Sequence, residues 1–179
     1  YPSVIRALNM GPETIIGQLR LDRTYDMIRK KMNNKASFAE AWEGIFNTLE
    51  YDLVQERDVA EKITVDWENG ETDQYTGAEI YDAVFLQNNP WAISANGTIF
   101  RCDTKGVVPN LLERWYAERK EMQKNLQNAI DTGDKEKIEF WDKRQLVKKI
   151  NLNSLYGAIL NPGCRFFDIR IGQSVTLTG

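Results

Sequence analysis

The sequence predicts an α+β protein dominated by helix, in which a long antiparallel helical hairpin stands on a domain containing small β-hairpins. Residues 110–130 and 135–156 each place apolar side chains at helical spacing, and the residues DTGD separate them. Two Asn-Gly pairs, at 69–70 and 96–97, lie between short segments of strand-forming residues, which is typical of tight β-hairpins.

The first third of the chain predicts helix after an irregular start. Residues 1–20 show no regular period, and residues 24–33 favour a helix with a basic end. Ser37 and Glu40 have the spacing of a capping box, which predicts that a helix begins there and continues over 38–60. Its apolar stripe, typical of core packing, consists of Trp42, Ile45, Phe46, Leu49 and Leu53.

Two β-hairpins and a short helix are predicted next. Residues 63–67 alternate like a half-buried strand, and residues 72–75 supply the returning strand. Thr76 and Glu79 repeat the capping-box spacing and predict a helix that ends before Pro90. A second hairpin is expected over residues 91–102.

The helical hairpin is predicted as one projecting unit over residues 107–157. Its first arm carries apolar positions Leu111, Leu112, Trp115, Met122 and Leu126. Its second arm carries Ile138, Trp141, Val147, Ile150 and Leu155, and we expect it to end at Gly157 and the Asn-Pro-Gly segment 161–163. Residues 1–106 would then form one domain, with an insertion near 24–90, to which residues 158–179 return.

The composition excludes several classes of site. The chain has no histidine, which excludes Ser-His-Asp chemistry and makes the usual zinc sites very unfavourable. Cys102 and Cys164 lie far apart, which favours two reduced thiols in a cytosolic protein. No stretch is long and apolar enough to cross a membrane. Residues 1–105 hold 11 basic and 17 acidic residues, so a basic anion-binding surface is expected only in the second half.

One face of the second arm carries candidate binding residues. Lys149, Asn153 and Tyr156 are spaced by four and three residues, which places them on one side of a helix. A cation, an amide and an aromatic ring there suit a phosphate, a sugar and a base. A solvated helix face with one buried tyrosine has the same spacing. The basic residues of the first arm, Arg114, Arg119, Lys120 and Lys124, also fit an ordinary solvent-exposed face.

The residues themselves favour the binding interpretation. The segment KINLNSLYG at 149–157 resembles the K-x-x-x-N-S-x-Y-G signature on the fingers of family B DNA polymerases. The segments CRFFDIR at 164–170 and SVT at 174–176 are similar to the palm region that follows it. YPSVIR at 1–6 and NMGPETI at 9–15 resemble the end of the first palm motif of the family.

Two further matches lie between these segments. The stretch from Asn96-Gly97 to Pro109 is similar to the strands that lead into the fingers, and Arg119-Lys120-Glu121 resembles the arginine segment of the first fingers helix. Together these matches come closest to the replicative polymerases of T-even-type tailed phages. The resemblance therefore implies fingers with part of the palm, in the host cytoplasm if the gene belongs to a phage.

The resemblance implies a role for each matching residue. Arg119 and Lys149 would contact the triphosphate of the incoming dNTP, and Asn153 would lie beside its phosphates and sugar. Tyr156 and Gly157 would flank the nascent base pair on the primer–template DNA.

Two further positions, Tyr1 and Lys124, would also contact the nucleotide. Tyr1 would lie beneath the deoxyribose, where its ring leaves no room for a 2′-hydroxyl. The family usually has a lysine four residues after the arginine, where this chain has Gln123. Lys124 would reach the phosphates instead, or that contact is lost.

The resemblance also implies which parts lie elsewhere. Two Mg²⁺ ions serve the complete enzyme, held by palm aspartates that match no residue here, and the exonuclease and thumb have no match either. We therefore expect a piece of a longer polymerase, with no catalytic or metal-binding residue of its own and no activity in isolation. Two alternatives are one subunit of a naturally split polymerase and a non-catalytic helical interaction domain.

Overall fold

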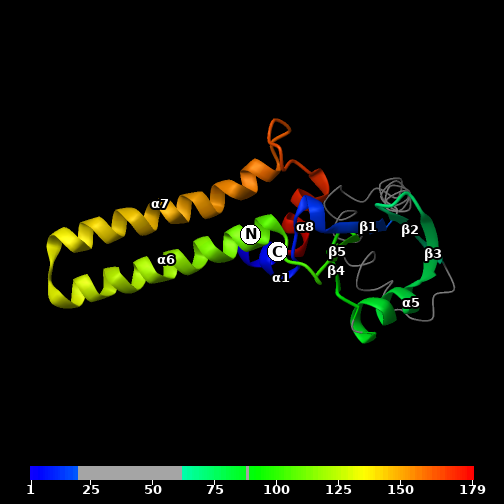
Figure 1. Cartoon of the computed structure of the whole chain (residues 1–179), viewed down its shortest axis with the longest axis horizontal. Coiled ribbons are helices and arrows are strands. Elements are labelled where there is room, and N and C mark those ends of the chain that lie inside the picture. The colour runs from blue at the N-terminus through cyan, green and yellow to red at the C-terminus, as the bar shows by residue number, and fades with distance from the viewer. Residues whose placement is uncertain (20–61, 88) are drawn as a thin grey trace, which may run out of the picture.

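The computed structural model describes residues 1–19, 62–87 and 89–179. Within these residues the chain combines a five-stranded antiparallel sheet with two long helices that project from it as a hairpin (Figure 1). The predicted α+β, helix-dominated class is therefore confirmed. The helices predicted over 24–33 and 38–60 lie outside the described residues.

The sheet has the strand order β3-β2-β1-β5-β4. Both predicted β-hairpins are present: β2 (Lys62–Trp67) pairs with β3 (Thr72–Thr76), and β4 (Trp91–Ile93) pairs with β5 (Thr98–Arg101). Gly70 and Gly97 adopt φ values of 89° and 77°, the left-handed conformation that these tight turns require. The central strand β1 (Ile15–Leu19), which joins the two hairpins, is not predicted by the sequence pattern.

A β-bulge in β1 lets one strand serve both faces of the sheet. Ile15 pairs with Phe100, while Gly17 pairs with Ile99, and the register shifts between them. Because side chains alternate between faces, the extra residue turns Ile15 and Leu19 to opposite sides. Ile15 joins the core beside Phe100, and Leu19 joins a second core beside Ile99.

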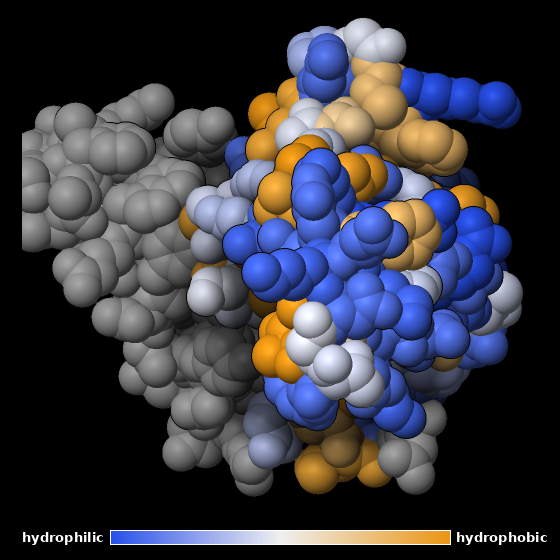
Figure 2. Space-filling view, turned by 90° about the vertical axis from the view of Figure 1, so that its left-hand side faces the viewer, coloured by the Kyte–Doolittle hydropathy of each residue, from blue (hydrophilic) through white to orange (hydrophobic). Residues whose placement is uncertain are grey.

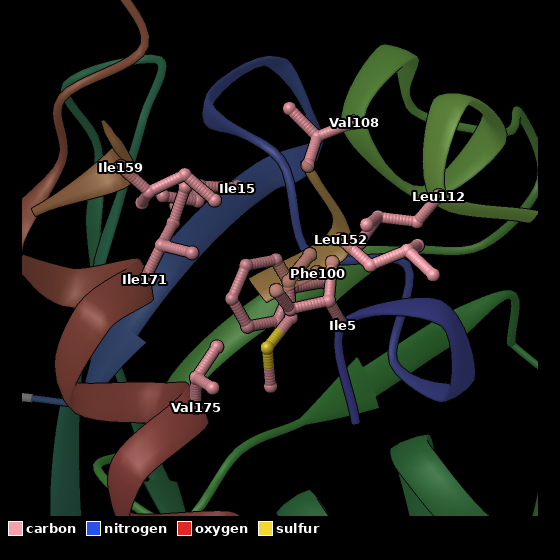
Figure 3. Close-up of a cluster of buried hydrophobic side chains, with 10 residues drawn as sticks. Ile5, Ile15, Phe100, Val108, Leu112, Leu152, Ile159, Ile171 and Val175 are labelled. Atoms are coloured by element: carbon pink, nitrogen blue, oxygen red, sulfur yellow. The ribbon is translucent and has the colours of Figure 1, made fainter. Parts of the chain in front are cut away.

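The two cores divide the helices between the two faces. On one face, the larger core collects side chains from α1 (Pro2–Ala7), α8 (Ile169–Thr178) and the bases of the two long helices (Figure 3). Its buried members are Ile5, Met10, Ile15, Phe100, Val108, Leu112, Leu152, Ile159, Ile171 and Val175. On the other face, α5 (Gly77–Tyr81) covers the smaller core through Ile80.

The capping box predicted at Thr76 is present. The Thr76 hydroxyl accepts a hydrogen bond from the backbone N–H of Glu79 at 3.2 Å, and the Glu79 carboxylate accepts one from Thr76 N–H at 2.7 Å. The helix then widens into the π-helical turn η3 (Asp82–Leu86).

The helical hairpin consists of α6 (Val107–Thr132) and α7 (Lys135–Ile159). Gly133 ends α6 in the left-handed conformation at φ 69°, and the Asp134 carboxylate accepts a hydrogen bond from Lys137 N–H to begin α7. Pro109 lies inside the first turn of α6 rather than before it, which is allowed because first-turn N–H groups need no helical partner. Gly157 lies within α7 and does not end it, contrary to the prediction.

Two residues predicted as apolar packing positions of α7 face solvent. Val147 is 57% exposed and Ile150 54% exposed, because α6 covers only one stripe of α7 and these two residues lie on the opposite side. Viewed toward the tip, the hairpin surface is mainly hydrophilic with separate hydrophobic patches (Figure 2). In the described part of the chain, no helix combines the length and apolar character needed to cross a membrane.

A buried asparagine fixes the point at which α6 leaves the sheet. The Asn9 amide donates to the carbonyls of Arg101 at 2.7 Å and Thr104 at 2.9 Å, and its oxygen accepts from Gly106 N–H at 2.9 Å. Glu13 accepts from Val107 N–H, which puts a carboxylate at the positive end of the α6 dipole. Two residues from the chain's first fifteen therefore anchor the first arm.

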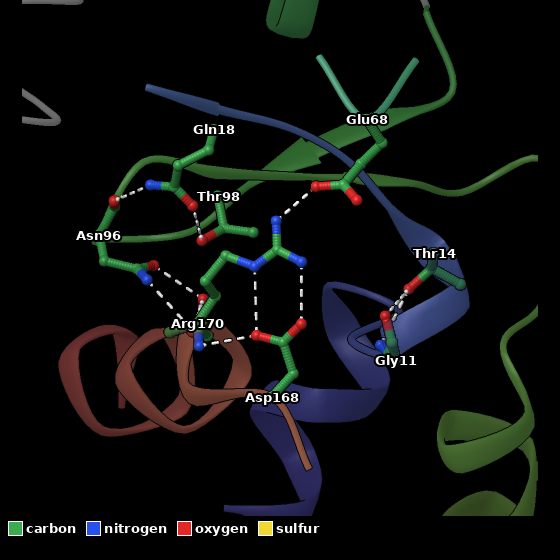
Figure 4. A network of polar contacts seen from close by, with 9 residues as sticks. Gly11, Thr14, Gln18, Glu68, Asn96, Thr98, Asp168 and Arg170 are labelled. Carbon is green, nitrogen blue, oxygen red and sulfur yellow. Dashed lines mark hydrogen bonds and ion pairs between the residues drawn. The ribbon is translucent and has the colours of Figure 1, made fainter. Parts of the chain in front are cut away.

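A polar network attaches α8 to the sheet (Figure 4). The Asn96 amide donates to the Arg170 carbonyl at 3.1 Å, and the buried Ser174 hydroxyl lies 2.9 Å from that of Ser94. The Arg170 guanidinium binds Asp168 through two hydrogen bonds and also pairs with Glu68 of the turn after β2. These carboxylates raise the pKa of Arg170, so the guanidinium stays charged.

Candidate functional site

Two tyrosines from distant parts of the sequence meet at the base of the hairpin. The ring of Tyr1, which precedes α1, stacks on that of Tyr156 from the last turns of α7, with centroids 4.4 Å apart and planes 3° apart. The Tyr156 hydroxyl lies 2.6 Å from the hydroxyl oxygen of Thr176 on α8. The structure therefore brings together the two aromatic residues that the sequence nominated separately.

Arg119 reaches from the first arm to the second. One terminal nitrogen of its guanidinium donates to the Gln145 side-chain oxygen on α7 at 3.5 Å, a long hydrogen bond. The Arg119 Nε is buried and has no hydrogen-bond partner among the described residues. A buried guanidinium nitrogen without a partner is costly. A planar guanidinium as a whole is a donor group that suits an anion.

Lys149 lies on the same stripe of α7 as the residue that Arg119 contacts. It follows Gln145 by four residues, which on a helix of 3.6 residues per turn leaves both on one side. Its side chain is exposed and makes no ion pair or hydrogen bond within the described ranges. Arg119 and Lys149 therefore share one flank of the paired arms, about one helical turn apart.

Asn153 continues this stripe toward the base of the hairpin. It is exposed, lies one turn beyond Lys149, and precedes Tyr156 by three residues. Gly157 follows as an exposed residue, and a Cβ atom built there meets no atom within 4 Å beyond its chain neighbours and the nearby backbone of its own helix. The order from tip to base is therefore cation, amide, aromatic ring and open backbone.

Gln123 and Lys124 lie on different sides of α6. Gln123 is half-buried, whereas Lys124 is exposed and makes no ion pair with any residue that the structure describes. Lys124 is turned by about 100° from its neighbour, as adjacent residues of a helix are. The structure therefore does not bring Lys124 to the residues that Arg119 contacts.

The opposite flank of the hairpin is closed by an ion pair. Lys148 binds Glu118 across the arms at 2.6 Å and lies 5.5 Å from the centre of the Trp115 ring. Lys148 is thus committed to holding the arms together, while its neighbour Lys149 is left without a partner in the described chain. This pair is a second contact between the arms, beside that of Arg119 with Gln145.

Arg6 is a candidate residue that the sequence did not indicate. Its guanidinium carbon lies 4.8 Å from the centre of the Tyr116 ring on α6, and its Nε is buried without a hydrogen-bond partner within the described ranges. Lys120 approaches the same ring at 5.6 Å. No spacing rule links α1 to α6, so only the folded structure reveals this contact.

The described residues do not form a metal site. No group of three or more cysteine, aspartate or glutamate side chains is close enough among them to hold an ion. Asp103 pairs with Arg101 at 2.6 Å, Asp134 pairs with Lys137 at 2.8 Å, and Asp131 accepts from Gln127 at 2.9 Å. The arginine lowers the pKa of Asp103. These three aspartates of the described part of the chain are therefore each engaged with a neighbouring side chain.

Both cysteines are free thiols, as the sequence predicts. Cys102 lies directly after β5, and Cys164 lies in the loop between α7 and α8. They have no part in the arrangement described above.

Comparison with known proteins identifies the class of protein to which this fold and this order of motifs belong. The sequence model for the family described as DNA polymerase family B matches residues 1–179. The chain therefore belongs to DNA polymerase family B, whose members generally use divalent metal ions.

A curated relative agrees with this assignment. The DNA-directed DNA polymerase of Enterobacteria phage T4 is 26% identical over 196 aligned residues, which take in 100% of this chain and 20% of that polymerase. The chain thus spans about one fifth of the length of this relative. The resemblance to phage polymerases inferred from the motifs is consistent with this match.

Proposed function

We propose that this chain forms the fingers and adjoining palm of a DNA-directed DNA polymerase, and that its helical hairpin binds the triphosphate of the incoming dNTP. One observation carries the proposal. Arg119 crosses to α7 at Gln145, one turn from Lys149, so both cations lie on the same flank of the paired arms.

The two cations suit different parts of the same task. The planar guanidinium of Arg119 matches two phosphate oxygens at once, whereas the Lys149 ammonium acts as a mobile point charge on a long stem. In phosphoryl transfer, such cations stabilise the negative charge that develops as the bond to the leaving phosphate breaks. Asn153 would donate its amide to the phosphates or sugar.

The aromatic residues at the base would contact the sugar and the new base pair. Tyr1 would lie beneath the deoxyribose and exclude a 2′-hydroxyl by bulk. Tyr156 would flank the nascent pair, and Gly157 would let the backbone approach closely because it has no Cβ. Lys124 would contribute only if its stem reached back across the helix.

The remaining machinery would come from outside these residues. In the proposed enzyme, other palm residues hold the Mg²⁺ ions, and the primer–template DNA and the rest of the polymerase are partners. We propose that the isolated chain binds nucleotide weakly and does not add it. Primer extension by the purified chain that stops on chelation would contradict this part of the proposal.

The test is triphosphate binding by the 179-residue chain, measured at low salt with a fluorescent dNTP. Arg119→Ala and Lys149→Ala should each weaken binding by about tenfold or more, because each removes a charge-assisted contact. Arg144→Ala and Lys143→Ala are matched controls on other sides of α7, where Arg144 lies 4.6 Å from the Phe140 ring centre and Lys143 pairs with Glu139. If all four variants lose the same affinity for the dNTP, binding is only non-specific charge attraction and the proposal is wrong.

A further inference from the structure

The hydroxyl of Thr176 has a defined hydrogen-bonding state. It donates to the carbonyl of Gly172, one turn earlier on α8, at 2.9 Å. A threonine hydroxyl has one proton to donate and can still accept. The 2.6 Å contact with Tyr156 must then be a hydrogen bond from the tyrosine hydroxyl to the threonine oxygen. Thr176 therefore fixes the far end of the Tyr156 side chain.

Tyr156 in turn supports Tyr1 from behind. Tyr1 is 61% exposed, and its ring contact within the described ranges is the parallel stack on Tyr156. A stack of this kind stabilises the pair beyond the effect of the area it buries. A ring that excludes a 2′-hydroxyl by bulk works only if it cannot swing aside, and Tyr156 blocks one such movement.

Three segments meet in this contact: the residue before α1, the last turns of α7 and the third turn of α8. Tyr156 also packs against the larger core, which includes Ile171 and Val175 of α8. The hydroxyl of Thr176 is thus presented by a helix that is itself anchored in the core. The position of the Tyr156 side chain therefore depends on where α8 lies.

We propose that Thr176 is a positioning residue for sugar selection: it holds Tyr156, which backs Tyr1 against the sugar of the incoming nucleotide. The inference rests on the proposed function, in which Tyr1 lies beneath the deoxyribose. Thr176 itself touches neither the sugar nor the base. Loss of its hydroxyl should loosen the Tyr1 ring and admit ribonucleotides more readily.

The first part of the test needs no nucleotide and so is independent of the proposed function. Thr176→Val and Tyr156→Phe each remove one side of the hydrogen bond, and unfolding of the 179-residue chain in urea reports their cost. A double-mutant cycle should give a coupling of about fivefold in the unfolding equilibrium, the value of one hydrogen bond. Additive effects would show that the two hydroxyls do not interact and would overturn the proposal.

The second part measures selectivity in a complete polymerase that carries this segment. The readout is the ratio of kcat/KM for a dNTP to that for the matching rNTP. Thr176→Val should lower the ratio by about fivefold, the effect of losing one positioning hydrogen bond, and Thr176→Ser should restore it because serine keeps the hydroxyl. Thr178→Val is the matched control, since its hydroxyl accepts from Ala95 N–H at 3.0 Å and not from Tyr156.

The outcomes separate the two proposals. Coupled hydroxyls with a lowered ratio support the positioning role. If the hydroxyls are coupled but Thr176→Val lowers kcat/KM equally for dNTP and rNTP, Thr176 contributes to stability alone and the positioning role is wrong. If Arg119→Ala and Lys149→Ala leave triphosphate binding intact while the hydroxyls are coupled, the proposed function fails although the contact stands.

Discussion

Gly172 of α8 lies against the side chain of Leu160, which follows α7, so closely that a Cβ on Gly172 would overlap Leu160 Cδ2. This contact sets how near α8 can approach the end of the second arm. Because Thr176 lies one turn further along α8, the same approach also sets the reach of its hydroxyl to Tyr156.

Gly172→Ala should therefore destabilise the chain, although alanine is the better helix former. We expect a loss of about 1–3 kcal/mol in the free energy of unfolding, from the overlap with Leu160. In a Leu160→Ala background the overlap is gone, and the same change should stabilise by about 0.5–1 kcal/mol through helix propensity. Urea unfolding of the four chains measures both effects, and the same sign in both backgrounds would disprove the contact.

Gly157→Ala, unlike Gly172→Ala, should stabilise the chain, while it should impair nucleotide addition. Gly157 is exposed within α7, and a Cβ placed there meets nothing outside the nearby backbone of its own helix. Alanine should therefore stabilise by about 0.5–1 kcal/mol. In a complete polymerase carrying this segment, the same methyl group should slow nucleotide addition, because it would stand between the helix and the base pair. Thermal unfolding and primer extension measure the two effects, and unchanged extension would remove Gly157 from the proposed site.

Asn9→Ala should release the start of α6 from the sheet. The change removes three hydrogen bonds and puts alanine at φ 53°, where only glycine is free of strain. We expect a cost of about 2–4 kcal/mol in the free energy of unfolding, since the Gly106 N–H is left buried without a partner. Asn9→Gly loses the same bonds without the strain, so it should be less destabilised by about 1 kcal/mol. Equal losses would show that the left-handed conformation costs nothing here.

The Asp134 carboxylate should make the turn between the arms sensitive to acid. Its pKa is lowered, chiefly by the hydrogen bond from the Lys137 side chain, so its contribution to stability is complete above the ordinary pKa of aspartate. That contribution is lost as the pH falls through the lowered value. Asp134→Ala should therefore lower the Tm at pH 7 and have little effect at a pH below the lowered pKa, where the carboxylate is protonated in both states. An equal loss at both pH values would assign the effect to the backbone.

Local sequence signals predicted much of this fold. The Asn-Gly pairs gave both β-hairpins, the Thr76–Glu79 spacing gave the start of α5, and Gly133 with Asp134 gave the turn of the helical hairpin. Each of these features depends on residues within a few positions of one another. Their chemistry is therefore complete in the sequence itself.

The missing elements depend on distant partners. Strand β1 contains Gly17 and too short an alternation to be recognised, and it forms only because Trp67 and Ile99 lie on either side of it. The exposure of Val147 and Ile150 depends on which stripe of α7 the first arm covers. Periodicity identifies an apolar position but does not identify the element that packs against it.

The candidate site also has residues that the sequence indicates and contacts that only the fold reveals. The motif gave Lys149, Asn153 and Tyr156, but the stack of Tyr1 on Tyr156 and the tether to Thr176 became visible only in the fold. Arg6 likewise needed the packing of α1 against α6. Whether Arg119 and Lys149 bind one triphosphate stays a prediction that the binding experiment decides.

The long helices are anchored in the core at their bases but not at their outer turns, which has a mechanical consequence. In α6, Val108 and Leu112 belong to the larger core, whereas the outer turns of both arms rest mainly on one another. The 26 residues of α6 span about 39 Å at 1.5 Å per residue, so each degree of tilt at the base carries the tip through about 0.7 Å. A tilt of a few degrees at the base, too small to disturb the core, would therefore move the tip of the hairpin by about the width of a side chain.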